Sequence, residues 1–244
     1  MIGRVAVLAC GLAAYLASGA ASAYLAGFCG DLWVTRSVDR GPAADASAAL
    51  LVDVAALALF GVQHSLMARP GFKAWLRRWV PAALERPAYL VATFAALAVL
   101  IWAWRPIPRL VWSIENTTVT GIVWLLCGLG WLLTLGATCL VDHYELMGLR
   151  QVWAHFRGRA FRPAAFKEIG AYRISRHPMM LGFLVAFWSV PVMTLGHLVF
   201  TLGMSLYIVI GVFLEERDLL ALYGSTYEKY RSRVARFVPL PWRT

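Results

Sequence analysis

Charged residues are scarce in this sequence of 244 residues, and acidic residues are the scarcer kind. Only 15% of the residues are charged, with 13 Asp and Glu against 23 Lys and Arg, whereas about 25% is typical of a soluble domain. Hydrophobic residues reach 60%, and the mean hydropathy is +0.65. A basic balance can indicate nucleic-acid binding, but here the basic residues lie between long apolar runs. The composition therefore indicates an integral membrane protein in a lipid bilayer, with no nucleic-acid partner.

Cysteine is also rare. The four cysteines form no CxxC pair and no His/Cys ligand spacing, which argues against a disulfide framework and against a zinc site. We expect them to act as small hydrophobic residues, and we expect no metal.

Long apolar runs, in contrast, are plentiful. Four of them approach or exceed the roughly 20 residues that cross a bilayer as a helix: residues 5–30, 48–67, 88–104 and 119–141. A further stretch of 38 residues, 177–214, lacks Lys, Arg, Asp and Glu. As one helix it would be about 57 Å long, nearly twice the ~30 Å hydrocarbon core. Because Pro191 and Gly196 interrupt it, we predict two short helices joined by a turn, with a re-entrant hairpin as the alternative.

The positive charges test this topology. With six crossings and a cytoplasmic N-terminus, 19 of the 23 Lys and Arg fall on the cytoplasmic side, as the positive-inside rule requires. The sequence thus predicts an all-α polytopic helical bundle with six transmembrane helices, five being the alternative. Both termini should be cytoplasmic, in a bacterial inner membrane. We expect one domain over 1–244, with four helices in 1–141, a cytoplasmic segment at 142–176 and a final hairpin with its C-terminal segment at 177–244.

Two titratable residues lie inside the second apolar run. Ionisable groups in membrane spans cost roughly 2.5–3.5 kcal/mol and are functional candidates. Asp53 is expected to cap its helix or to pair with Arg36 or Arg40. His64 lies toward the cytoplasmic side, which makes it a candidate catalytic base; a histidine satisfied by a structural hydrogen bond is the alternative.

A polar segment, Asp142-His143-Tyr144-Glu145, follows the fourth apolar run. Consecutive titratable groups at a cytoplasmic membrane boundary can orient a small reactive group, or they can anchor a helix end among lipid headgroups. Glu145 and His143 are therefore further candidates for the base.

The densest group of polar residues is C-terminal. Arg176, His177 and Pro178 directly precede the fifth apolar segment, and Glu215 and Glu216 follow the sixth. A hairpin brings these ends together, so that Arg176, His177 and the helix N-terminus offer donors to a carboxylate. The two glutamates offer acceptors to an ammonium group. This pattern complements an amino-acid zwitterion; interfacial charges that pair with one another are the alternative.

The motifs at 176–182, 215–219 and 223–230 resemble those of the integral membrane methyltransferases. This group includes isoprenylcysteine carboxyl methyltransferases, phospholipid N-methyltransferases and NnrU-like proteins. The resemblance implies S-adenosyl-L-methionine (SAM) as the cofactor, enclosed by the hairpin and the C-terminal segment. The residues that it assigns to the pocket are Arg176, His177, Pro178, Leu181, Gly182, Glu215, Glu216, Tyr227 and Arg231.

Other segments narrow the resemblance. Residues 63–72, 104–108, 142–153 and 193–198 are similar to the methanethiol S-methyltransferases. This similarity implies methyl transfer from SAM to a small volatile thiol, methanethiol, giving dimethyl sulfide and S-adenosylhomocysteine. The candidate catalytic bases are His64 first, then Glu145 and His143. The alternatives are a methyltransferase for a lipid or prenyl-cysteine, and a non-catalytic transporter or accessory protein. No feature of the sequence indicates an oligomeric state.

Overall fold

The computed structural model describes residues 3–238, and nearly all their regular structure is helical. These residues form two compact units, each described separately below. The first unit comprises residues 3–109, 143–163 and 194–200, and the second comprises 110–142, 164–193 and 201–238.

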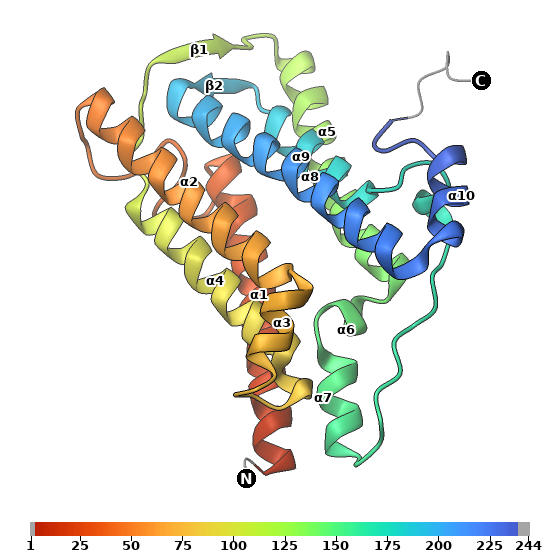
Figure 1. Ribbon diagram of the computed structural model, residues 1–244. Helices are drawn as coiled ribbons and strands as arrows, with labels where there is room; N and C mark the ends of the chain where they lie inside the picture. The colour runs from red at the N-terminus through yellow and green to blue at the C-terminus, as the bar shows by residue number, and fades with distance from the viewer. Residues whose placement is uncertain (1–2, 239–244) are drawn as a thin grey trace. The chain divides into compact units, whose positions relative to one another are not determined.

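Three long helices dominate the first unit, and α4 packs against both of the others (Figure 1). Each is long and apolar enough to cross a membrane, and helical structure satisfies the backbone polar groups there without water. Their bounds confirm three of the expected spans: α1 (Arg4–Gly30), α2 (Ala46–Ala68) and α4 (Glu85–Ala103). Shorter elements complete the unit: α3 (Pro70–Leu76), η1 (Ala82–Leu84), α6 (His143–Leu146) and α7 (Leu149–Phe156).

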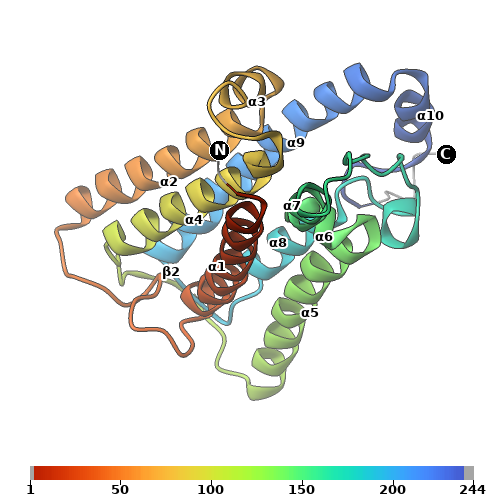
Figure 2. The ribbon, with the colours of Figure 1, turned by 90° about the horizontal axis from the view of Figure 1, so that it is seen from below.

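At one end of this unit, shorter segments pack beside the long helices. Helix α7 lies beside the first half of α1 (Figures 1 and 2), where Gly11 gives it room. A Cβ atom on Gly11 would lie 2.7 Å from both methyl groups of Val152. The start of α4 lies at the same end, since a Cβ atom on Gly148 would lie 2.7 Å from Cβ of Arg86.

Asp53 lies toward the opposite end of α2 and is fully buried. Its Oδ1 accepts a hydrogen bond from the backbone N–H of Arg105, with an N···O distance of 2.8 Å. The expected partners are engaged elsewhere: Arg36 donates to the carbonyl of Trp102, and Arg40 pairs with Asp31. The expected pairing was therefore wrong, because the peptide after α4 supplies the donor that the buried carboxyl needs.

In the second unit, the helices α5 (Thr117–Val141) and α8 (Pro178–Trp188) pack antiparallel through small residues. Gly130 and Thr134 on α5 face Gly182 and Ala186 on α8. A Cβ atom on Gly130 would lie 2.7 Å from the backbone N of Ala186 and from the carbonyl O of Gly182. Small residues four apart on both partners allow such close backbone approach between membrane helices.

Helix α8 is shorter than the sequence predicted. Its 11 residues extend about 17 Å, roughly half of the hydrocarbon core. After α8 the chain continues in extended backbone, and the carbonyl of Pro191 there accepts a hydrogen bond from the N–H of Ile114 at 2.9 Å. Strands β1 (Leu110–Ser113) and β2 (Val192–Thr194) then pair. In this extended segment Val190 and Met193 are buried, whereas Val192 is 46% exposed.

Helix α9 (Leu195–Tyr223) is longer than expected, with 29 residues. Among the described residues, five helices are long and apolar enough to span a membrane, which is the smaller of the two expected numbers. The chain is a polytopic all-α membrane protein. The short helices η2 (Gly170–Arg173) and α10 (Ser225–Arg233) flank the start of α8 and the end of α9 in sequence.

Candidate functional site

In the second unit, the start of α8 meets α9 at a buried ion pair. The guanidinium of Arg176 lies 2.8 Å from Oε1 of Glu216. The side chains are 8% and 5% exposed, respectively. The hairpin therefore brings together two of the residues that the sequence nominated, although they are 40 positions apart.

His177 joins both glutamates. Its Nε2 lies 3.2 Å from Oε1 of Glu216, and its Nδ1 lies 3.5 Å from Oε2 of Glu215. The His177 side chain is buried, whereas that of Glu215 is 47% exposed. Glu216 is thus held by protein partners, and Glu215 keeps an oxygen-rich face toward solvent.

Arg236 completes a charged cluster with Arg176, His177, Glu215 and Glu216. Sequence reasoning missed this arginine. Its guanidinium donates to Oε2 of Glu216 at 2.9 Å and lies over the ring of Phe213, with 4.2 Å to the ring centroid. The chain before α8 and the chain after α10 pair at Ser175 and Ala235, which positions this arginine. No motif or spacing marks Arg236 in the sequence, because its place depends on that pairing.

The same C-terminal segment holds Arg176. The Arg176 guanidinium donates to the carbonyl oxygens of Arg231 and Val234. The side chain of Arg231 is exposed, so its contribution in this structure comes from its backbone carbonyl.

Tyr227 is almost fully buried, and its hydroxyl has no hydrogen-bond partner within residues 3–238. Burial, reinforced by the nearby Glu216 carboxylate, raises the pKa of Tyr227 to about 12. Burial also raises the pKa of Tyr172 to about 12, helped by Glu215. Tyr227 therefore stays a neutral hydroxyl that can donate a hydrogen bond near the cluster.

Pro178 and Gly182 shape the beginning of α8. Pro178 occupies the first helical turn, where its fixed backbone suits the helix. No side chain caps this N-terminus, so its free N–H groups favour an anionic partner. Leu181 is partly buried one turn on, with its N–H bonded to the carbonyl of His177.

The first unit holds the candidate bases. His64 is bonded on both ring nitrogens: Nδ1 lies 3.0 Å from Oγ1 of Thr93, and Nε2 lies 2.5 Å from the hydroxyl of Tyr89. Both partners come from α4. Sequence reasoning missed them because they are about 25 to 29 positions away and depend on how α2 and α4 face each other.

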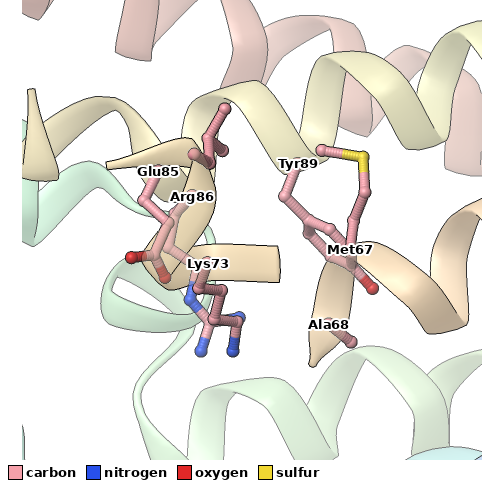
Figure 3. A pocket seen from close by; sticks show the side chains of 7 residues that line it. Met67, Ala68, Lys73, Glu85, Arg86 and Tyr89 are labelled. Atoms are coloured by element: carbon pink, nitrogen blue, oxygen red, sulfur yellow. The ribbon is translucent and has the colours of Figure 1, made fainter. Parts of the chain in front are cut away.

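Tyr89 also lines a pocket in this unit (Figure 3). The pocket includes about 330 Å³ of empty space, part of it open to solvent. Its lining residues are Met67, Ala68, Lys73, Leu76, Glu85, Arg86 and Tyr89. Burial, with help from Arg86, lowers the pKa of Lys73, and Glu85 is held by Arg77.

The other candidate bases lie in the segment after α5. His143 Nε2 is 3.2 Å from the hydroxyl of Tyr15 on α1. The backbone carbonyl of Glu145 accepts hydrogen bonds from the Gly148 N–H and from the Gln151 side chain. His64 and His143 thus each pair with a tyrosine from a transmembrane helix.

Comparison with known proteins identifies the family of this chain. The sequence model of the family described as NnrU protein matches residues 52–238. The chain belongs to the NnrU family. This membership confirms the family-level resemblance seen in the motifs.

Several relatives match most of the chain. A methanethiol S-methyltransferase of Mycobacterium tuberculosis is 43% identical over 233 residues, or 96% of either chain. One of Pseudomonas deceptionensis is 44% identical over 210 residues, covering 86% of this chain and 80% of the relative. Nurim of Sus scrofa is 34% identical over 186 residues, covering 72% of this chain and 70% of its own. No solved structure matches.

Proposed function

We propose that this NnrU-family protein is a thiol S-methyltransferase that converts methanethiol to dimethyl sulfide. The observation that carries the proposal is the 43% identity to a methanethiol S-methyltransferase over 96% of both chains. The NnrU family match over residues 52–238 spans both the charged cluster of the second unit and the His64–Tyr89 pair of the first.

The methyl donor that best fits the second unit is SAM. The amino-acid portion of SAM has a carboxylate and an ammonium group, and the cluster offers complementary groups. The half-exposed Glu215 suits the ammonium, and the uncapped start of α8 suits the carboxylate. Both ring nitrogens of His177 face glutamate oxygens, so His177 positions Glu215. The buried Tyr227 hydroxyl, which lacks a partner in the described structure, is a further donor.

Glu216 has a different part in this arrangement. Its carboxylate is shared by Arg176, His177 and Arg236, so it fixes the cationic side chains around the pocket. Charge-assisted hydrogen bonds of this kind hold geometry firmly. Leu181 would border the pocket from the first turn of α8, and Arg231 from α10, whereas Gly182 packs against Gly130 and Thr134 of α5.

When bound, SAM supplies a methyl group activated by its sulfonium charge. The substrate provides the nucleophilic sulfur, which reacts as the thiolate. The thiol of free cysteine has a pKa of about 8.5. A thiol of that acidity or weaker, such as methanethiol, is mostly protonated at neutral pH. A positioned base contributes typically about 10²–10⁴-fold, and His64 is our first candidate, ahead of Glu145 and His143.

The membrane orientation follows from the charges. We place both termini in the cytoplasm of a bacterial inner membrane, with α8 and the extended segment after it as a sixth crossing beside the five long helices. With six crossings, 19 of the 23 Lys and Arg lie on the cytoplasmic side. A reporter that is active only in the periplasm, fused to the C-terminus, should be silent. An active fusion would reverse the orientation.

An acceptor panel tests the substrate class. The purified protein is incubated with radiolabelled SAM and, in separate reactions, methanethiol, a longer alkyl thiol, phosphatidylethanolamine and a farnesylcysteine analogue. We expect a labelled volatile product in the methanethiol reaction, whether or not the longer thiol is also methylated in its own reaction. Label in the lipid or prenyl-cysteine, with none from methanethiol, would overturn the proposal.

A further inference from the structure

The pocket in the first unit combines an apolar wall with a cationic one. Figure 3 shows Met67 and Tyr89 on one side, and Lys73, Glu85 and Arg86 on the other. Glu85 is 9% exposed and is neutralised by Arg77, which leaves Lys73 and Arg86 as the excess charge. A small ligand with an apolar body and an anionic atom fits such walls.

Tyr89 stands between this pocket and His64. Tyr89 lines the pocket, whereas His64 is not among the lining residues. The Tyr89 hydroxyl reaches Nε2 of His64, and Nδ1 of the same ring reaches the hydroxyl of Thr93. With the Nδ1–H tautomer, the ring donates to Thr93 and accepts from Tyr89. A proton leaving the pocket therefore meets Tyr89 first.

We propose that this pocket binds the thiol substrate and that Tyr89 is the catalytic residue that takes the thiol proton, passing its own proton to His64. The inference rests on the proposed function and specifies its thiol site. The methyl group of methanethiol lies against Met67 and Ala68, and the sulfur lies toward the Tyr89 hydroxyl. His64 is then a positioning residue and the final proton acceptor.

The proton transfer balances within these groups. The S–H bond breaks, and its electron pair stays on sulfur to give the thiolate. The thiol proton goes to the Tyr89 oxygen while the Tyr89 O–H proton goes to Nε2 of His64, so that tyrosine ends neutral and the imidazole ends as a cation. Lys73 and Arg86 stabilise the thiolate, and the imidazolium releases its proton to water.

Removing one hydroxyl tests the relay. Tyr89→Phe should lower kcat/KM for methanethiol by about 10²-fold and leave the calorimetric SAM affinity unchanged. Tyr15→Phe is the matched control, because it also removes a hydroxyl paired with a histidine, and it should remain close to wild type. Loss confined to Tyr15→Phe would move the role to His143 and overturn the proposal.

Substrate acidity separates chemistry from shape. Methaneselenol has nearly the form of methanethiol but is much more acidic, so it needs less help with deprotonation. The deficit of Tyr89→Phe should shrink several-fold with the selenol. The charged groups that line the pocket with Tyr89 are Lys73, Glu85 and Arg86, and they are intact in this variant. An equal deficit with both substrates would show that Tyr89 only shapes the pocket.

Filling the pocket tests its location. Ala68→Trp should raise KM for methanethiol at least 10-fold with SAM affinity unchanged, since Ala68 at the end of α2 lines the cavity. Leu66→Trp, two residues earlier and 52% exposed, should behave as wild type. If wild type makes dimethyl sulfide while Ala68→Trp and Tyr89→Phe both match it, the thiol pocket lies elsewhere. If wild type makes none, the proposed function itself fails.

Discussion

Arg176 and Glu216 form a buried ion pair, with 2.8 Å between the guanidinium and Oε1 and both side chains at least nine-tenths buried. Removing one partner of a buried pair leaves an uncompensated charge, at a cost of about 3–5 kcal/mol. Glu216→Gln should therefore lower the free energy of unfolding in detergent by about that amount.

A matched control is available in the same unit. Glu168 pairs with Arg233 at 3.0 Å, but the arginine side chain is 62% exposed. Exposed pairs contribute about 0–1 kcal/mol, so Glu168→Gln should change stability little. Equal losses in the two variants would contradict the structural role of Glu216.

Glu215 should contribute to SAM affinity but not to the stability of the fold. Its side chain is 47% exposed and lies 3.5 Å from His177, so Glu215→Gln should weaken SAM binding about 10-fold, or ~1.4 kcal/mol, and leave the melting temperature unchanged. His177→Ala should weaken binding too. Asp218→Asn, on the next turn of α9, serves as the control. Unchanged calorimetric affinity in both site variants would reject the pocket.

The close contact between α5 and α8 should tolerate no added methyl group. A Cβ atom on Gly182 would lie 2.7 Å or less from backbone atoms of Gly130 and Thr134. Overpacking of this kind typically costs about 1–3 kcal/mol, so Gly182→Ala should lower stability in thermal melts. Gly128→Ala has nothing within 4 Å of the new atom and should be neutral or stabilising by up to about 1 kcal/mol.

Alkaline pH should destabilise the protein through its buried tyrosines. Burial raises the pKa of Tyr227 to about 12 from 10, so the folded state keeps a proton that the unfolded state loses. Stability is therefore full below about pH 10 and falls toward pH 12. Tyr227→Phe should flatten this decline in melts between the two pH values, whereas Tyr144→Phe at an exposed site should not. An unchanged slope in Tyr227→Phe would refute the assignment.

Much of the fold could be predicted from the sequence, because the membrane imposes it. Apolar runs at residues 5–30, 48–67, 88–104 and 119–141 became α1, α2, α4 and α5 with small shifts at their ends. Pro191 predicted an interruption of the last apolar stretch, but the end of α8 three residues earlier, at Trp188, could not be predicted. The extended segment after α8 is stabilised by pairing with β1, and that contact leaves no mark in the sequence.

The candidate site, like the fold, was predicted only in part. His177 and Glu216 were placed together from the sequence because a hairpin joins its ends, and they lie 3.2 Å apart. Arg236 and Tyr89 were not found, since each depends on contacts between distant segments. The partner of Asp53 was mispredicted for the same reason: a backbone N–H leaves no mark on residue identity.

The central claim is methyl transfer from SAM to methanethiol. The most direct measurement uses SAM with a trideuterated methyl group and unlabelled methanethiol, with the headspace analysed by gas chromatography and mass spectrometry. The account predicts dimethyl sulfide carrying one trideuterated methyl group, formed only when protein and both substrates are present, and greatly reduced by Glu215→Gln at low SAM concentration. Absence of labelled dimethyl sulfide from folded protein that has both substrates would contradict it.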